Sequence, residues 1–368
     1  MKRRILPFVV IAGSLAAVYA CSSSSDSTPS TNTNPEAGTQ PETSTTDLDS
    51  STGSDTSTNP DTSVVSKTNP IEGIAAPKQV ADANGFADGP QWWKDGLYVS
   101  RPLSGLLLKV NFANGQVDEI RNAGSGPGTG AVGNSVDKNN NLITAELTSI
   151  TRTPPDGGAA TTIATMYNDG DGGTFPFDVP NDLVQHPTSG TIYATDPGYG
   201  SLTATTNHLV RIMTDGGAFL LEDFPDAPRP NGIALTKDGS TLYITVTSPA
   251  LGTKPFVRKY TVAANGTLTN PSLFATFPKP TVAVTDPSTN DDPDGIAVDD
   301  NGNVYVAWRL GINVYKADGT RYGAEPSITV PNSPTNVTFG RADRRSLFIT
   351  TATGKIYESV VNIPGLLQ

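Results

Sequence analysis

The stretch from 293 to 308 reads PDGIAVDDNGNVYVAW and contains one strand–turn–strand unit. Asp294 precedes a short apolar run at 296–298, a polar loop follows at 299–303, and the alternation at 304–308 predicts a second strand. Short runs of this kind, separated by Gly, Asn, Asp and Pro, recur along the chain, and long helical patterns do not. The pattern is typical of an all-β protein.

Five further segments repeat this unit. They are FADGPQWWKDGLYVS (86–100), GNSVDKNNNLITAE (133–146), PNDLVQHPTSGTIYATD (180–196), PNGIALTKDGSTLYITVT (230–247) and PTNVTFGRADRRSLFIT (334–350). Each unit carries an Asn or Asp before or within its first strand, and we call these the marker residues: Asp88, Asn134, Asn181, Asn231, Asp294 and Asn336. The markers are 42 to 63 residues apart, which is the length of a propeller blade. The sequence therefore predicts a six-bladed β-propeller over 71–368, with a two-sheet sandwich as the alternative.

A closed propeller leaves no long sheet edge exposed, so one terminus must complete a blade begun by the other. We expect the first blade to be completed in this way, with 354–361 and 71–80 as candidate strands. The longest interval between markers holds a Pro- and Asp-rich insertion at 278–293, which predicts a surface loop overhanging the site.

The N-terminus carries the pattern of an export signal. Three basic residues precede an apolar run at 5–18, which is too short for a membrane span, and a small residue precedes Cys21. This resembles a bacterial lipoprotein signal over 1–20, with lipid attached to Cys21; a plain secretory signal is the alternative. Ser22 after the cysteine favours the outer membrane of a Gram-negative bacterium. Residues 21–70 are rich in Ser, Thr, Asp and Pro, which predicts a disordered tether.

Charge and cysteine content narrow the possible partners. The formal net charge is −11 and the folded part has no basic cluster, which argues against nucleic acid as a partner. Cys21 is the only cysteine, so an exported chain would have no internal disulfide. We expect a monomer held at the membrane by its lipid.

The markers are either turn residues or a ring of ligands at one mouth of the central channel. Asn and Asp before a strand commonly make turns. However, the closing turn of each unit comes later, and two carboxylates among neutral amides suit a hard divalent cation. The two histidines, His186 in a predicted turn and His208 in a predicted strand, give little support for zinc or a histidine triad.

The six quoted motifs, covering about 85–368 in order, resemble the gluconolactonase/senescence-marker-protein (regucalcin-like) family. That resemblance implies a six-bladed propeller with one divalent metal, usually calcium, in the channel mouth. It implies that Asp88, Asn231 and Asp294 bind the metal, that Asn181 reaches the metal or the substrate, and that Asp294 is also the acid/base residue. Glu146 resembles an acid of bacterial members and is a candidate substrate contact, with a surface or supporting role as the alternative.

Two departures from the family pattern bear on the chemistry. Asp88 stands where the family has glutamate and is one methylene shorter. Val179 stands where some animal members have a sugar-binding arginine, so their sugar contacts do not carry over.

The sequence thus predicts a calcium-dependent hydrolase of a small lactone or ester, in which the cation stabilises the oxyanion and Asp294 moves the proton. The alternatives are a non-catalytic propeller that binds a sugar, peptide or protein, and a metal-free propeller resembling strictosidine synthase. The triad Asp88, Asn231 and Asp294 argues against the metal-free form.

Overall fold

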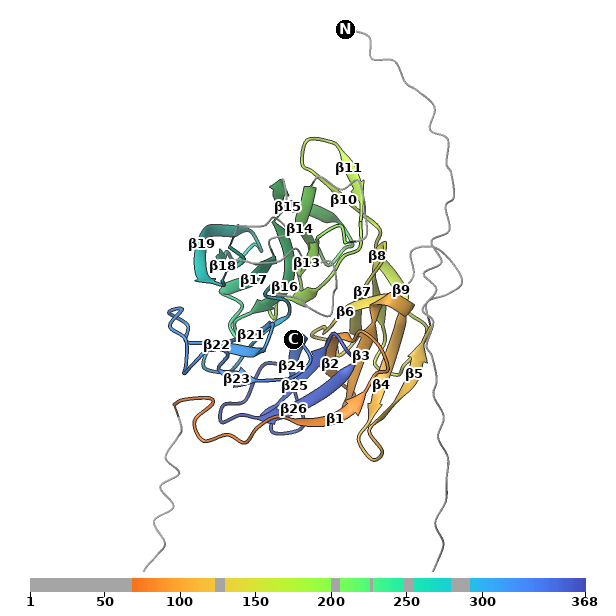
Figure 1. The fold of residues 1–368 in the computed structure, drawn as a ribbon. Helices are drawn as coiled ribbons and strands as arrows, with labels where there is room; N and C mark the ends of the chain where they lie inside the picture. Colours follow the sequence, from red (N-terminus) through yellow and green to blue (C-terminus); the bar gives the residue numbers. More distant parts are fainter. Residues whose placement is uncertain (1–67, 123–129, 200–205, 226–227, 248–253, 279–291) are drawn as a thin grey trace, which may run out of the picture. The chain divides into compact units, whose positions relative to one another are not determined.

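The computed structural model describes residues 68–122, 130–199, 206–225, 228–247, 254–278 and 292–368. In these residues six β-sheets are arranged in a ring (Figure 1), and helix is limited to one 3₁₀ turn, η1 (Pro102–Ser104). The predicted all-β, six-bladed propeller is confirmed. The predicted signal at 1–20, Cys21 and nearly all of the tether lie outside the described residues. Within the described part of the chain, no helix is long and apolar enough to cross a membrane.

The first three blades each contain an antiparallel meander that runs from the channel outwards. Blade 1 comprises β2 (Asp88–Trp93), β3 (Gly96–Arg101), β4 (Leu106–Asn111) and β5 (Gln116–Arg121). Blade 2 comprises β6 (Ala131–Val136), β7 (Leu142–Glu146), β8 (Ser149–Thr153) and β9 (Thr161–Ala164). Blade 3 comprises β12 (Leu183–Gln185), β13 (Ile192–Asp196), β14 (Thr206–Ile212) and β15 (Ala218–Pro225), extended at its outer edge by β10 (Met166–Asn168) and β11 (Thr174–Pro176).

The other three blades have the same plan. Blade 4 comprises β16 (Arg229–Leu235), β17 (Thr241–Thr247), β18 (Phe256–Val262) and β19 (Leu268–Thr276). Blade 5 comprises β20 (Ile296–Val298), β21 (Val304–Trp308), β22 (Gly311–Tyr315) and β23 (Ile328–Thr329). Blade 6 comprises β24 (Pro334–Gly340), β25 (Ser346–Thr351), β26 (Lys355–Val360) and β1 (Lys78–Asp82).

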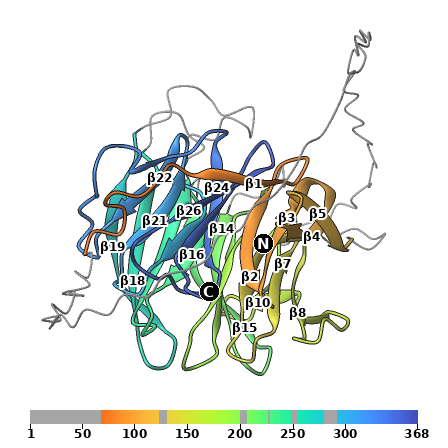
Figure 2. The same ribbon diagram turned by 90° about the horizontal axis from the view of Figure 1, so that it is seen from below.

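The ring is closed in the last blade. β1 pairs antiparallel with β26 (Figures 1 and 2). In this pair Lys78 lies opposite Glu358 and Asp82 lies opposite Lys355. The prediction that the first blade is completed by the other terminus was wrong, because β2 to β5 already form a full sheet. Both candidate segments were nevertheless the right ones: they pair with each other, and the N-terminal strand covers the edge that β26 would otherwise expose.

Apolar side chains from neighbouring blades hold the sheets together. Tyr305 and Val314 of blade 5 pack against Phe339 and Leu347 of blade 6 in one buried cluster. Blades 6 and 1 share another, in which Phe348 lies among Leu97 and Val99. The alternating sequence pattern of each strand produces this arrangement, because successive side chains point to opposite faces of a sheet and both faces of a blade are covered.

At the channel, backbones of neighbouring blades approach so closely that only glycine fits at several positions. A Cβ on Gly89 (φ +49°) would lie 2.2 Å from the Val132 carbonyl oxygen, and one on Gly295 would lie 2.5 Å from the Asn336 Cα. Gly133 approaches Asp182 in the same way. We call the residues that meet in these contacts the close-approach positions, because they are equivalent from blade to blade. The residue before each of them lies at the mouth of the channel.

Candidate metal centre and active site

Asp88, Asn181, Asn231 and Asp294 occupy equivalent positions at the mouth of the channel. Each directly precedes one of the close-approach positions, at the start of the innermost strand of blade 1, 3, 4 or 5. All four are at least nine-tenths buried. The structure therefore gathers the four predicted residues at one end of the channel, while their roles as ligands stay a prediction.

Two of the six markers are not equivalent to the others. Asn134 follows Gly133, and Asn336 itself occupies the close-approach position against Gly295. The corresponding mouth residues of blades 2 and 6 are Val132 and Thr335. The repeat alignment was therefore shifted by two residues in blade 2 and by one in blade 6.

Asn134 is part of the framework between blades 1 and 2. Its Nδ2 donates to the Gly89 carbonyl at 2.8 Å and to Ser100 Oγ at 2.7 Å, and its Oδ1 accepts from Thr144 Oγ1 at 3.0 Å. All of its polar side-chain atoms are paired within the protein, as expected for a structural residue.

Threonines of the preceding blade fix the backbone at two of the mouth residues. Thr195 Oγ1 donates to the Asn231 carbonyl oxygen at 2.6 Å, and Thr245 Oγ1 donates to that of Asp294 at 2.5 Å. β16 also changes register between Pro230 and Ile233, so that Asn231 lies in an irregular, bulge-like step of the ladder. Such irregularities re-aim side chains next to functional sites.

The side-chain amide of Asn231 bears most directly on metal binding. The residue is 4% exposed, and its Nδ2 donates to the Tyr199 hydroxyl at 3.0 Å. Its Oδ1 is buried and has no hydrogen-bond partner among the described residues. A buried amide oxygen left unpaired costs free energy, and an oxygen-seeking cation would satisfy it.

Asp294 lies close enough to Tyr199 for its negative charge to oppose ionisation of the phenol. Burial raises the pKa of Tyr199, and the negative charges of Asp294 and Asp292 raise it further. The backbone N–H of Asp294 donates to the Ala307 carbonyl at 2.9 Å, which ties the residue to β21. A fixed backbone thus holds Asp294 near Tyr199, the hydrogen-bond partner of Asn231.

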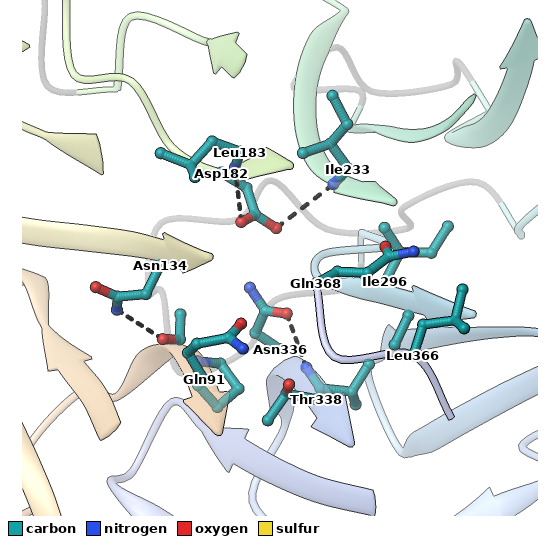
Figure 3. A pocket seen from close by; sticks show the side chains of 14 residues that line it. Gln91, Asn134, Asp182, Leu183, Ile233, Ile296, Asn336, Thr338, Leu366 and Gln368 are labelled. Atoms are coloured by element: carbon teal, nitrogen blue, oxygen red, sulfur yellow. Dashed lines mark hydrogen bonds between the residues drawn. The ribbon is translucent and has the colours of Figure 1, made fainter. Parts of the chain in front are cut away.

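A third carboxylate, Asp182, joins the site and was missed in the sequence. Burial raises the pKa of both Asp88 and Asp182, and the charge of Asp88 raises that of Asp182 further. Asn336 lies near Asp182 in Figure 3, and hydrogen bonding from its side chain partly offsets the rise in pKa of both carboxyl groups. Asp182 directly follows the marker Asn181 in the sequence. Its position beside the channel becomes evident only when the blades are aligned by their close-approach positions, because Asp182 occupies that position in blade 3.

The backbone before Asn181 is strained. Val179 has φ +63°, a left-handed conformation that a β-branched residue rarely adopts. Its N–H donates to the Leu147 carbonyl of blade 2 at 2.8 Å. Strain of this kind is often found at functional sites, and here it directs the chain into Pro180 and Asn181.

Glu146 lies at the end of β7 and is paired within the protein. Its Oε1 is 2.8 Å from Arg121 Nη2 and accepts a hydrogen bond from Thr151 Oγ1 at 2.8 Å. Such internal pairing is typical of a supporting residue, which is the alternative role considered from the sequence. The assignment of Glu146 as a substrate contact stays a prediction. The two histidines lie where the sequence put them, His186 before a turn and His208 in β14.

Below the mouth, the channel narrows to a cavity of about 30 Å³. Asp182, Asn134 and Asn336 line it from the blades, and Leu366 and Gln368 line it from the C-terminal segment (Figure 3). Gln368 hydrogen bonds to the backbone of Leu235, which holds that segment across the lower end of the channel. The cavity has room for water but is too small for a molecule the size of a sugar.

The donor set fits a hard divalent cation. Buried carboxylates and an unpaired amide oxygen are the ligands that calcium prefers. Within the described ranges, no three His, Cys, Asp or Glu side chains lie close enough to hold a metal without other ligands. A cation at this mouth would therefore depend on the amide oxygen of Asn231 as well as on Asp88 and Asp294.

A family model described as the SMP-30/gluconolactonase/LRE-like region matches residues 86–353. The chain belongs to this family. Among curated relatives, the gluconolactonase of Zymomonas mobilis is 32% identical over 184 residues, covering 48% of this chain and 49% of the relative. The pentonolactonase of Haloferax volcanii is 31% identical over 178 residues, covering 47% and 53%. The chain thus spans about half the length of these relatives.

Solved structures of the gluconolactonase family share the fold. A gluconolactonase from Xanthomonas campestris has a TM-score of 0.62 at 24% identity, covering 80% of this chain and 91% of its own. A calcium-binding regucalcin from Agrobacterium tumefaciens has a TM-score of 0.60 at 18% identity, covering 80% and 96%. At these identities the likeness establishes the propeller architecture, in agreement with the family match.

Proposed function

We propose that this protein is a calcium-dependent hydrolase of small lactones. The observation that carries the proposal is the buried Oδ1 of Asn231, which accepts no hydrogen bond from the part of the chain that the structure describes and lies at the same mouth of the channel as Asp88 and Asp294. Family membership and the relatives that are named lactonases support the reaction class. The substrate would be an aldonolactone or a similar small cyclic ester.

In this proposal Asp88, Asn231 and Asp294 hold the cation. A bound calcium ion would supply positive charge to the lactone carbonyl oxygen as it becomes an oxyanion. Asn181 would orient the substrate from the neighbouring blade, and the closed lower channel would direct it to the mouth. The Asp88 carboxylate, in place of glutamate, would have to lie closer to the cation or bind it through water.

Asp294 would act as general base and then general acid. Its carboxylate accepts a proton from the attacking water as the new carbon–oxygen bond forms. The ring carbon–oxygen bond then breaks, and the proton passes to the leaving alkoxide, which becomes the hydroxyl of the open hydroxy acid. The backbone contacts from Thr245 and Ala307 would keep this carboxylate in place through both transfers.

We further propose that the protein is exported and anchored by lipid on Cys21, in the outer membrane. The apolar run and the cysteine after a small residue support this proposal. Mass spectrometry of the N-terminal peptide from membranes should show a lipid-modified Cys21. Cys21→Ser should move the protein to the soluble fraction, and an unmodified, membrane-free wild type would contradict the anchor.

The reaction is tested with a panel of lactones. Glucono-1,5-lactone and pentonolactones are incubated with purified protein, and acid release is followed with a pH indicator. Activity should be lost after chelation and return with added calcium. A chelator-treated protein that hydrolyses the panel at an unchanged rate would contradict metal dependence, and a calcium-loaded protein that opens none of them would contradict the lactonase proposal.

A further inference from the structure

Three hydrogen bonds form a chain that begins at the amide of Asn231. Asn231 Nδ2 donates to the Tyr199 hydroxyl at 3.0 Å, and this hydroxyl is 3.4 Å from Thr247 Oγ1. Thr247 Oγ1 in turn donates to the Arg229 carbonyl oxygen at 3.3 Å. The chain links the loop after β13 to both inner strands of blade 4.

The chain can run in one direction only. Thr247 has a single hydroxyl proton, which goes to the Arg229 carbonyl, so Thr247 accepts from Tyr199. Tyr199 has then used its own proton and can only accept from Asn231.

The tyrosine ring is itself held in place. The Arg229 guanidinium lies over the Tyr199 ring at 5.2 Å from its centroid, in a cation–π contact. Arg229 comes two residues before Asn231 on β16. The same strand therefore supplies both the Asn231 amide and the guanidinium that packs on the Tyr199 ring.

From this geometry we propose that Tyr199 is a positioning residue that fixes the side-chain amide of Asn231 with Oδ1 towards the cation site. The inference rests on the proposed metal-dependent function and names a residue that supports it. An asparagine can present either its oxygen or its NH₂ group in nearly the same space, and only the oxygen can bind a cation. Because Tyr199 must accept a hydrogen bond, it selects the NH₂ group and leaves the oxygen free.

The test compares calcium affinities by calorimetry on the full chain, so its readout is binding and not turnover. Tyr199→Phe removes the acceptor and should weaken calcium binding by about 10- to 100-fold, as is common for residues that orient metal ligands. Tyr193→Phe is the matched control. Its hydroxyl is also buried and hydrogen bonded, to the Gly266 carbonyl at 2.8 Å, and its loss should leave calcium affinity unchanged.

A double-mutant cycle separates orientation of the amide from general damage. Asn231→Asp replaces the amide with a carboxylate, in which either oxygen can bind the cation. In that background Tyr199→Phe should change calcium affinity by less than about threefold, so that the two substitutions are not additive. A merely structural role for Tyr199 would give the same loss in both backgrounds.

The outcomes distinguish this inference from the proposed function. A wild type that binds calcium, with a folded Tyr199→Phe variant of equal affinity, overturns the positioning role alone. Equal losses of affinity from Tyr199→Phe in the wild-type and Asn231→Asp backgrounds would also overturn that role and leave the proposed function standing. A wild type that binds no calcium overturns both.

Discussion

The carboxyl groups of Asp88 in blade 1 and Asp182 in blade 3 interact across the channel. Burial is the main cause of the raised pKa of each, and the charge of Asp88 adds to the shift of Asp182. Two buried carboxylates whose charges interact are unfavourable unless one is protonated or a cation lies nearby. The pair therefore links proton binding, cation binding and stability.

Without calcium, stability should fall with rising pH. The folded pKa values, about 6 for Asp88 and about 7 for Asp182, lie above the ordinary value of 3.8, so the folded state binds protons more tightly than the unfolded state. The stabilising effect of protonation is complete below pH 3.8 and is lost as the pH rises to about 7. Calcium should therefore raise the melting temperature more at pH 8 than at pH 5, as measured by calorimetric melting.

Asp182→Asn removes one of the two charges and should flatten this dependence. Asp171→Asn, an exposed change in the turn between β10 and β11, is the matched control and should leave the pH profile unaltered. The account would be wrong here if calcium raised the melting temperature equally at both pH values.

Asp294→Asn should abolish most of the turnover and leave the fold intact. The substitution removes the base but keeps the side-chain shape, and the backbone contacts at Asp294 do not involve the carboxylate. We expect a loss in kcat of about 10²- to 10⁴-fold, the usual contribution of a general base. Lactone hydrolysis and thermal melting are measured together; a folded variant with calcium bound and full activity would exclude Asp294 as the base.

Asp88→Glu should keep or strengthen calcium binding, whereas Asp88→Ala should weaken it severely. Glutamate restores the residue that the family carries and extends the carboxylate towards the cation. Calcium titrations of both variants check this. If the glutamate variant folds but loses binding, the mouth of this propeller is built differently from that of the family.

Arg344 should contribute measurably to stability by fastening the C-terminal segment. Its guanidinium donates to both Asp300 carboxylate oxygens, at 3.0 and 2.7 Å, and to the Gly365 carbonyl at 2.8 Å. Arg344→Ala should lower the free energy of unfolding by about 1–2 kcal/mol in urea melts. Lys237→Ala is the control: it removes an exposed partner of the same carboxylate and should cost less than about 0.5 kcal/mol.

The Arg344 effect should depend on pH in a defined direction. Hydrogen bonding from Arg344 is the largest cause of the lowered pKa of Asp300, so this stabilisation is present above the ordinary value of 3.8 and is lost as the pH falls through the lowered value. The difference between wild type and Arg344→Ala should shrink in acid. A constant difference would mean that the arginine acts through packing.

The repeat was enough to predict the blades because strand alternation and turn chemistry are local properties. Asp88, Asn231 and Asp294 were found in this way and through the family resemblance. The register in blades 2 and 6 was predicted wrongly, because Asn134 and Asn336 match the other four markers in residue type but differ from them in their place beside the channel. Only the close approach of backbones at Gly133 and Gly295 distinguishes them.

Other features depend on contacts between distant parts of the chain. Asp182 acquires its importance from Asp88, which lies two blades away, and Tyr199 from Asn231 and Thr247 in the next blade. The pairing of β1 with β26 joins opposite ends of the chain, so no local pattern could decide which blade is completed.

The most direct test of the central claim is a crystal structure of the protein with calcium. The account predicts one ion at the channel mouth, with oxygens of Asp88, Asn231 and Asp294 converging on it, at about 2.3–2.6 Å for each direct ligand. Asp88 could alternatively reach it through a bound water. A calcium-soaked crystal in which the Asn231 and Asp294 oxygens diverge and no ion occupies the mouth would contradict the account.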